Sequence, residues 1–145
     1  MTRPIEKVLV ANRGEIAVRI VRGLRDLGIR SAVIYSDADR AGLPVLLADE
    51  AYRIGPAPSA ESYLDAAAIV DLAVEIGADA IHPGYGFLAE NAGFAQRVEE
   101  AGLRVLGPPS SAMAVMGSQI ESRRRMREAG VPLIPGGERA LESVE

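Results

Sequence analysis

Apolar and polar positions along this 145-residue chain alternate between short apolar runs and longer segments with helical spacing. Apolar residues that recur every three or four positions form one face of an α-helix. The clearest such segment spans residues 14–27, and its apolar positions are Ile16, Ile20, Leu24 and Leu27. A glycine follows this segment and favours the end of a helix there. The pattern predicts a helix over residues 14–27 with those four side chains at helical spacing.

Five short apolar runs elsewhere predict strands, and the segments between them predict further helices. The expected strands are residues 5–11, 31–35, 52–54, 78–82 and 103–106. The other expected helices are residues 44–48, 62–76, 88–101, 110–116 and 120–129, with residues 131–134 extended. Strands separated by helices favour a parallel, doubly wound sheet covered on both faces. The predicted fold is therefore an α/β three-layer sandwich with a mostly parallel five-stranded sheet.

The composition is that of an ordinary folded chain, with 48% hydrophobic and 25% charged residues. No apolar run approaches the ~18 residues of a membrane-spanning helix, and no charged-then-apolar leader opens the chain. We therefore expect no membrane partner and a cytoplasmic location. The net charge of −4 argues against nucleic-acid binding. The absence of cysteine excludes disulfides and thiolate sites, and a single histidine leaves no predicted metal site.

Residues 82–91 form the most informative segment, because two glycines, a proline and an aromatic pair lie between an apolar strand and a helix. Glycine lets the backbone approach a ligand closely. With strand order 3-2-1-4-5, this loop and the turn at residues 12–15 are neighbours at the sheet edge where ligands bind. The candidate site residues are His82, Gly84, Tyr85, Gly86, Phe87, Glu90 and Asn91. From spacing alone, both segments could equally be structural turns, and a histidine at a strand end is more often structural.

Other polar clusters have less specific interpretations. The spacing Gly84-x-Gly86-x-x-Ala89 fits a dinucleotide-binding fingerprint weakly, because no acidic residue follows the next strand. The arginines of residues 123–127 are typical of an exposed helix face. We expect most of a further set of carboxylates to be solvated, namely Asp37, Asp39, Asp49 and Glu50.

Two long motifs in this order carry a family resemblance: Ala-Asn-Arg-Gly-Glu-Ile-Ala at residues 11–17, and His-Pro-Gly-Tyr-Gly-Phe-Leu-Ala-Glu-Asn at residues 82–91. The chain resembles the N-terminal domain of the biotin carboxylases from about residue 7 to residue 136. Shorter matches support this at residues 46–50, 54–57, 62–64 and 129–132. The resemblance implies a Rossmann-like, pre-ATP-grasp domain over residues 1–116. Residues 117–145 would then be a connecting helix and the start of an ATP-grasp domain.

The resemblance also implies an activity. Biotin carboxylases are ATP-dependent ligases that carboxylate biotin on a carrier protein with bicarbonate and Mg²⁺, within acyl-CoA carboxylases, including those of fatty acid biosynthesis, and pyruvate carboxylases. The implied partners are the remaining ATP-grasp and C-terminal domains, the biotin carboxyl carrier protein, a carboxyltransferase and a second copy in a homodimer. The loop at residues 82–91 would form a wall of the active site, with Tyr85 near biotin and bicarbonate. The first helix would contribute Arg19, Arg22 and Asp26 to the dimer interface. The resemblance gives no individual role to Asn12, Arg13 or Glu15.

Two departures from the family pattern qualify these expectations. Gln119 stands where the family has a lysine that contacts the nucleotide, and losing a charged hydrogen bond costs ~1.5–3 kcal/mol. Lys7, the only lysine, is too far along the chain to be an evident substitute. The chain also ends where the family's nucleotide-covering part begins. We therefore expect an isolated domain, a fragment or one piece of a split enzyme, inactive alone. A non-catalytic assembly or dimerisation module and a different ATP-grasp ligase are the alternatives.

Overall fold

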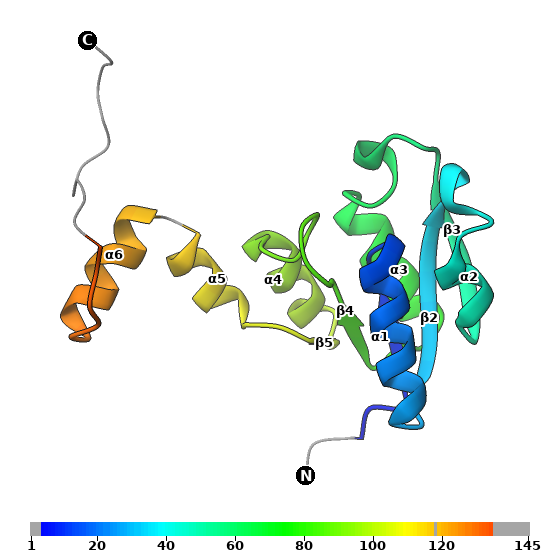
Figure 1. The fold of residues 1–145 in the computed structure, drawn as a ribbon, viewed down its shortest axis with the longest axis horizontal. Coiled ribbons are helices and arrows are strands. Elements are labelled where there is room, and N and C mark those ends of the chain that lie inside the picture. The colour runs from blue at the N-terminus through cyan, green and yellow to red at the C-terminus, as the bar shows by residue number, and fades with distance from the viewer. Residues whose placement is uncertain (1–3, 118, 135–145) are drawn as a thin grey trace.

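The structure is a computed structural model that describes residues 4–117 and 119–134, and it contains one five-stranded sheet with helices on both faces (Figure 1). The strands are β1 (Lys7–Val10), β2 (Arg30–Ser36), β3 (Glu50–Gly55), β4 (Ala80–His82) and β5 (Arg104–Val105). Their order is β3-β2-β1-β4-β5, and every pairing is parallel. This confirms the predicted sandwich and the strand order from which the position of the site follows.

Four α-helices and two short 3₁₀ turns connect the strands within the described residues, and two further helices follow β5. The helices are α1 (Gly14–Asp26), α2 (Leu43–Leu47), α3 (Ala66–Glu75), α4 (Ala92–Glu100), α5 (Ser110–Met116) and α6 (Gln119–Glu128). The 3₁₀ turns are η1 (Asp37–Asp39) and η2 (Ser59–Glu61). Helices α1 and α2 pack on one face of the sheet, and α3 and α4 pack on the other. Helices α5 and α6 extend to one side of the sheet (Figure 1).

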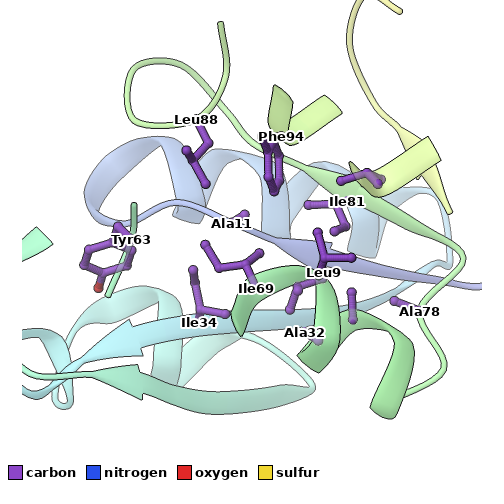
Figure 2. Packing of buried hydrophobic residues seen from close by; sticks show 13 residues of the cluster. Leu9, Ala11, Ala32, Ile34, Tyr63, Ile69, Ala78, Ile81, Leu88 and Phe94 are labelled. Atoms are coloured by element: carbon purple, nitrogen blue, oxygen red, sulfur yellow. The ribbon is translucent and has the colours of Figure 1, made fainter. Parts of the chain in front are cut away.

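The central strand β1 is buried on both faces, which explains its unbroken apolar run. Val8 and Val10 belong to the core beneath α1, and Leu9 belongs to the core beneath α3 and α4. All three side chains are completely buried. Figure 2 shows the core beneath α3 and α4, in which Leu9 lies beside Ile69 of α3 and Ile81 of β4. Because neighbouring residues of a strand point to opposite faces, one apolar strand supplies both cores.

Helix α1 matches its predicted range closely, but the last apolar position of the predicted helix lies just beyond its end. Ile20 and Leu24 are buried, whereas Leu27 is 74% exposed. The helix ends at Asp26, so Leu27 is its C-cap and no longer follows helical spacing. Gly28, with φ +69°, then turns the chain toward β2.

The helices predicted at residues 62–76 and 88–101 begin later than expected. Asp65 caps α3 by accepting a hydrogen bond from the Ala68 N–H at 3.0 Å, and Asn91 caps α4 in the same way. A capping residue has non-helical backbone angles, so the residues before it belong to a turn. Strands β1, β4 and β5 are shorter than predicted, whereas β2 and β3 are longer, and residues 131–134 lie in no helix or strand of the described structure.

Lys7 lies at the amino end of β1, away from the carboxyl edge of the sheet. Its Nζ is 2.8 Å from a Glu50 carboxylate oxygen and donates to the Ile76 carbonyl at 2.9 Å. Its side chain therefore ties α3 and β3 to β1, and it cannot replace a nucleotide-binding lysine at the other edge. Among the described helices, none is long and apolar enough to cross a membrane.

Candidate active-site wall at the carboxyl edge of the sheet

The turn after β1 and the loop after β4 meet at the carboxyl edge of the sheet, as the predicted strand order requires. The Ala11 N–H donates to the His82 carbonyl at 2.9 Å. Asn12, which is 3% exposed, donates through Nδ2 to the carbonyls of Pro83 at 2.6 Å and Tyr85 at 2.8 Å. Its Oδ1 accepts from the N–H of the next residue at 2.9 Å. Asn12 therefore joins the two segments through backbone groups alone.

Gly84 and Gly86 both have positive φ, but only Gly84 also makes a close approach. A Cβ at Gly84, where φ is +68°, would lie 2.8 Å from Asn12 Nδ2 and 3.2 Å from Ile16 Cγ1. At Gly86, where φ is +65°, a Cβ would have no atom within 4 Å. The sequence predicts a glycine that permits close approach, and at Gly84 the neighbouring group is the Asn12 amide of this chain. Gly86 is required for backbone conformation only.

Tyr85 projects from the loop with 62% of its surface exposed. Its hydroxyl donates to the Glu15 carboxylate in the first turn of α1. This hydrogen bond raises the pKa of the Tyr85 phenol, because the carboxylate stabilises the protonated hydroxyl. The loop therefore presents an exposed aromatic ring whose hydroxyl keeps its proton at neutral pH.

Phe87 has the left-handed backbone conformation, with φ of 43°, which is unfavourable for a bulky residue by roughly 1–2 kcal/mol. Its ring stacks on Tyr63, with centroids 5.2 Å apart and an interplanar angle of 24°. Next to it, Leu88 is 4% exposed and points into the core beside Phe94 (Figure 2). The stacking and the buried leucine hold the end of the loop in this conformation.

Asp39 belongs to the same network, and the sequence reasoning missed it. Arg13 donates to it from Nε at 2.7 Å and from Nη2 at 2.6 Å, and the Tyr63 hydroxyl donates at 2.7 Å. These bonds, led by those from Arg13, lower the pKa of Asp39 to about 2. The Tyr63 hydroxyl also accepts from the Ser36 N–H at 3.0 Å. A chain of contacts thus runs from the turn after β1 through Asp39 and Tyr63 to the loop.

Of the four carboxylates expected to be mostly solvated, Asp37 and Asp49 are exposed and Asp39 and Glu50 are half-buried, and each also has a partner. Asp37 pairs with Arg53, Asp49 accepts from Ser31, and Glu50 pairs with Lys7. Their partners are between 16 and 43 residues away in the sequence, so local spacing gives no sign of them.

His82 has a structural environment. Its Nδ1 accepts a hydrogen bond from the Gly84 N–H at 3.1 Å. Burial lowers the pKa of His82, which favours the neutral ring with its proton on Nε2. This geometry agrees with the structural interpretation of a histidine at a strand end.

The remaining predicted site residues lie apart from this network. Glu90 is exposed and lines a cavity of about 370 Å³ between the loop and α5, together with Pro108 and Met113. Asn91 accepts from the Phe94 N–H at 2.8 Å and so has a capping role. Gln119 begins α6, and its side chain lies outside the described part of the structure.

Arg19, Arg22 and Asp26 are exposed on α1, away from the sheet core. No group of three or more histidine or acidic side chains converges on a possible metal position within residues 4–117 and 119–134.

Comparisons with known proteins agree on one family. Residues 4–113 match the family model described as "Biotin carboxylase, N-terminal domain". The chain is 52% identical over 141 residues to Biotin carboxylase 1 of Bacillus subtilis, covering 97% of this chain and 31% of that protein. It is 57% identical over 141 residues to the mitochondrial methylcrotonoyl-CoA carboxylase subunit alpha of Oryza sativa subsp. japonica, covering 97% of this chain and 19% of that protein.

Solved structures give the same result. The biotin carboxylase domain dimer of Hydrogenobacter thermophilus 2-oxoglutarate carboxylase, in complex with MgADP, ADP and bicarbonate, has a TM-score of 0.92 and 48% identity. The match covers 98% of this chain and 31% of that one. The chain thus spans about a third or less of the relatives that it matches, at their N-terminal part. With its fold, its two motifs and these matches, the chain belongs to the biotin carboxylase N-terminal domain family.

Proposed function

We propose that this chain acts as the N-terminal domain of a biotin carboxylase, an ATP-dependent ligase that carboxylates biotin on a carrier protein. The observation that carries the proposal is the loop at residues 82–91. This loop is fixed at the carboxyl edge of the sheet and exposes Tyr85. Residues 4–113, which include the loop, match the family model. The relative from Hydrogenobacter was solved with MgADP and bicarbonate, which supports ATP, Mg²⁺ and bicarbonate as ligands of the complete enzyme.

In this proposal the loop forms one wall of the active site. Tyr85 contributes an aromatic surface next to biotin and bicarbonate, and its hydroxyl is held by its hydrogen bond to Glu15. His82, Gly84, Gly86 and Phe87 shape the wall rather than exchange protons. We assign the ligands of Mg²⁺ and most contacts to the nucleotide to the ATP-grasp part of the complete enzyme, with Gln119 as a weak contact at the edge of this chain.

The assembly follows from the same proposal. We divide the chain into a pre-ATP-grasp domain at residues 1–116 and a connecting segment at residues 117–145. We place a homodimer interface on α1, where Arg19, Arg22 and Asp26 are exposed. The other partners are the ATP-grasp and C-terminal domains, the biotin carboxyl carrier protein and a carboxyltransferase, and the predicted location is cytoplasmic. The names of the relatives include carboxylases of methylcrotonoyl-CoA, pyruvate and 2-oxoglutarate, so we assign no particular acceptor.

A chimera tests this function. Residues 1–145 replace the corresponding segment of Bacillus subtilis Biotin carboxylase 1, to which the chain is 52% identical. The expected result is ATP hydrolysis that depends on free biotin and bicarbonate, while the 145-residue chain alone shows none. A folded chimera that hydrolyses no ATP in response to biotin, with the chain still able to self-associate, contradicts the proposal and favours an assembly module. Biotin-dependent hydrolysis by the chain alone contradicts the assignment of the nucleotide to the other domains.

A further inference from the structure

Asn12 is a buried polar residue at the candidate site, and its side-chain amide forms all of its hydrogen bonds with backbone groups. Its two Nδ2 hydrogens go to the carbonyls of Pro83 and Tyr85, and Oδ1 accepts from the N–H of Arg13. The two carbonyls lie 71 and 73 residues away in the sequence. A buried amide that reaches across the fold in this way fixes the relative positions of the two segments it joins.

The position of the two carbonyls shows which part of the loop is held. They flank Gly84, so the amide fixes the backbone on both sides of the residue that approaches it most closely. The second carbonyl belongs to Tyr85, whose hydroxyl donates to Glu15, three residues after Asn12. Tyr85 is thus held at two points by the turn after β1, through its main chain by Asn12 and through its side chain by Glu15.

We propose that Asn12 is the positioning residue of the active-site wall: its buried amide grips the Pro83 and Tyr85 carbonyls and so sets the place of the Tyr85 ring for the reaction. The inference rests on the proposed function and assigns to Asn12 a role in it. Asn12 itself contacts no reacting group and acts through Tyr85.

The chemistry of the site explains why an asparagine stands there. The position requires two donors and one acceptor within the reach of a short side chain, which an amide provides and which serine or aspartate cannot. Asn12→Asp keeps the shape of the side chain but places carboxylate oxygens against carbonyl oxygens at 2.6 and 2.8 Å. Glutamine adds a methylene group where Gly84 already leaves no room.

The first test measures kinetics in the chimera. We expect Asn12→Asp to lower kcat for biotin-dependent ATP hydrolysis about tenfold or more and to raise KM for biotin, with KM for ATP unchanged within about twofold. The matched control is Ser31→Ala at the opposite edge of the sheet, which also removes a side-chain hydrogen bond of a buried residue, to Asp49 at 2.8 Å. It should leave all three constants within about twofold of the parent. A folded Asn12→Asp chimera with the kinetics of the control overturns the inference, since a purely structural role changes only stability.

The second test does not depend on activity. An inactive chimera would contradict the proposed function but not the role of Asn12, and this test would still examine that role. NMR of the 145-residue chain with labelled tyrosine reports cross-peaks between the Tyr85 ring and the Glu15 side chain, assigned with Tyr85→Phe. In Asn12→Ala these cross-peaks should lose more than about half their intensity, and in Ser31→Ala they should persist. Unchanged cross-peaks in folded Asn12→Ala overturn the inference. If Asn12→Asp does not fold in the chimera, Asn12→Ala takes its place with the same expected kinetics.

Discussion

The contact between Gly84 and Asn12 yields a sharp stability prediction, because the chain offers a matched control. Gly84→Ala places an alanine at a φ of +68°, and Gly86→Ala places one at +65°. Both variants therefore incur the same left-handed penalty of roughly 1–2 kcal/mol and the same change in the unfolded chain. They differ in surroundings, because only at Gly84 does the new Cβ meet another atom within 4 Å.

The size of the difference follows from what the new Cβ displaces. At 2.8 Å from Nδ2 it forces the Asn12 amide away from one or both carbonyls that it now holds. Leaving a buried hydrogen-bonding group unpaired costs about 1–3 kcal/mol. Because one or both of these bonds are lost and Ile16 Cγ1 at 3.2 Å is also crowded, we expect Gly84→Ala to reduce the free energy of unfolding by about 2–4 kcal/mol more than Gly86→Ala does. For a chain of this size the corresponding difference in Tm is about 10 °C.

Urea and thermal unfolding of the 145-residue chain measure this difference. A double-mutant cycle adds a second condition, since in Asn12→Ala the displaced amide is absent. The extra penalty at Gly84 should then fall to below about 1 kcal/mol, with the contact to Ile16 Cγ1 at 3.2 Å remaining. The reasoning would be refuted if the two glycine variants lost the same free energy of unfolding in the parent chain. It would also be refuted if the larger loss of Gly84→Ala persisted in the Asn12→Ala background.

Three further predictions concern other parts of the site. Because the pKa of Asp39 lies at about 2, below its ordinary value of 3.8, its carboxylate stabilises the folded chain above pH 4 by about 2 kcal/mol, and this is lost as the pH falls toward 2. Urea unfolding from pH 2 to 7 should show this loss in the parent and not in Asp39→Asn. Phe87→Ala should be less stable than Phe87→Gly by about 1 kcal/mol in urea unfolding, since both lose the stacking on Tyr63 but only alanine keeps the left-handed strain. In the chimera, Gln119→Lys should lower KM for ATP about tenfold or more if residue 119 has the proposed nucleotide contact, because lysine supplies a charged hydrogen bond there.

Each of these has an outcome that contradicts it. An acid-unfolding profile identical in Asp39→Asn and the parent would show that the ion pair with Arg13 contributes nothing to stability. Phe87→Gly less stable than Phe87→Ala would mean that the backbone there is not strained. An unchanged KM for ATP in Gln119→Lys would remove residue 119 from the nucleotide site.

The sequence predicted the architecture well, because periodicity reports burial directly. The run at residues 5–11 indicated a buried first strand, and β1 is buried on both faces and supplies both cores. The strand order then placed the turn at residues 12–15 beside the loop at residues 82–91, which the Asn12 bonds confirm. The glycines of the loop were expected to let the backbone approach a ligand, and at Gly84 the group that approaches is a side chain of the same chain.

The rest depends on contacts that local patterns do not encode. Asp39 looked like one more loop carboxylate, and only the fold brings Arg13 to it from 26 positions away. The stacking of Tyr63 on Phe87 likewise joins two turns, each of which had been predicted as part of a helix or beside one. Asn91 shows why element ends were missed. Apolar spacing continues through it, whereas its side chain caps α4 and starts the helix later.

The most direct test of the central claim is the formation of carboxybiotin from labelled bicarbonate by the chimera, since product formation separates carboxylation from uncoupled ATP hydrolysis. The account predicts ATP-dependent incorporation of label into biotin, reduced about tenfold or more in Asn12→Asp and retained in Ser31→Ala. A folded chimera that incorporates no label, while Bacillus subtilis Biotin carboxylase 1 assayed beside it does, would contradict the claim that this chain supplies a working wall of the active site.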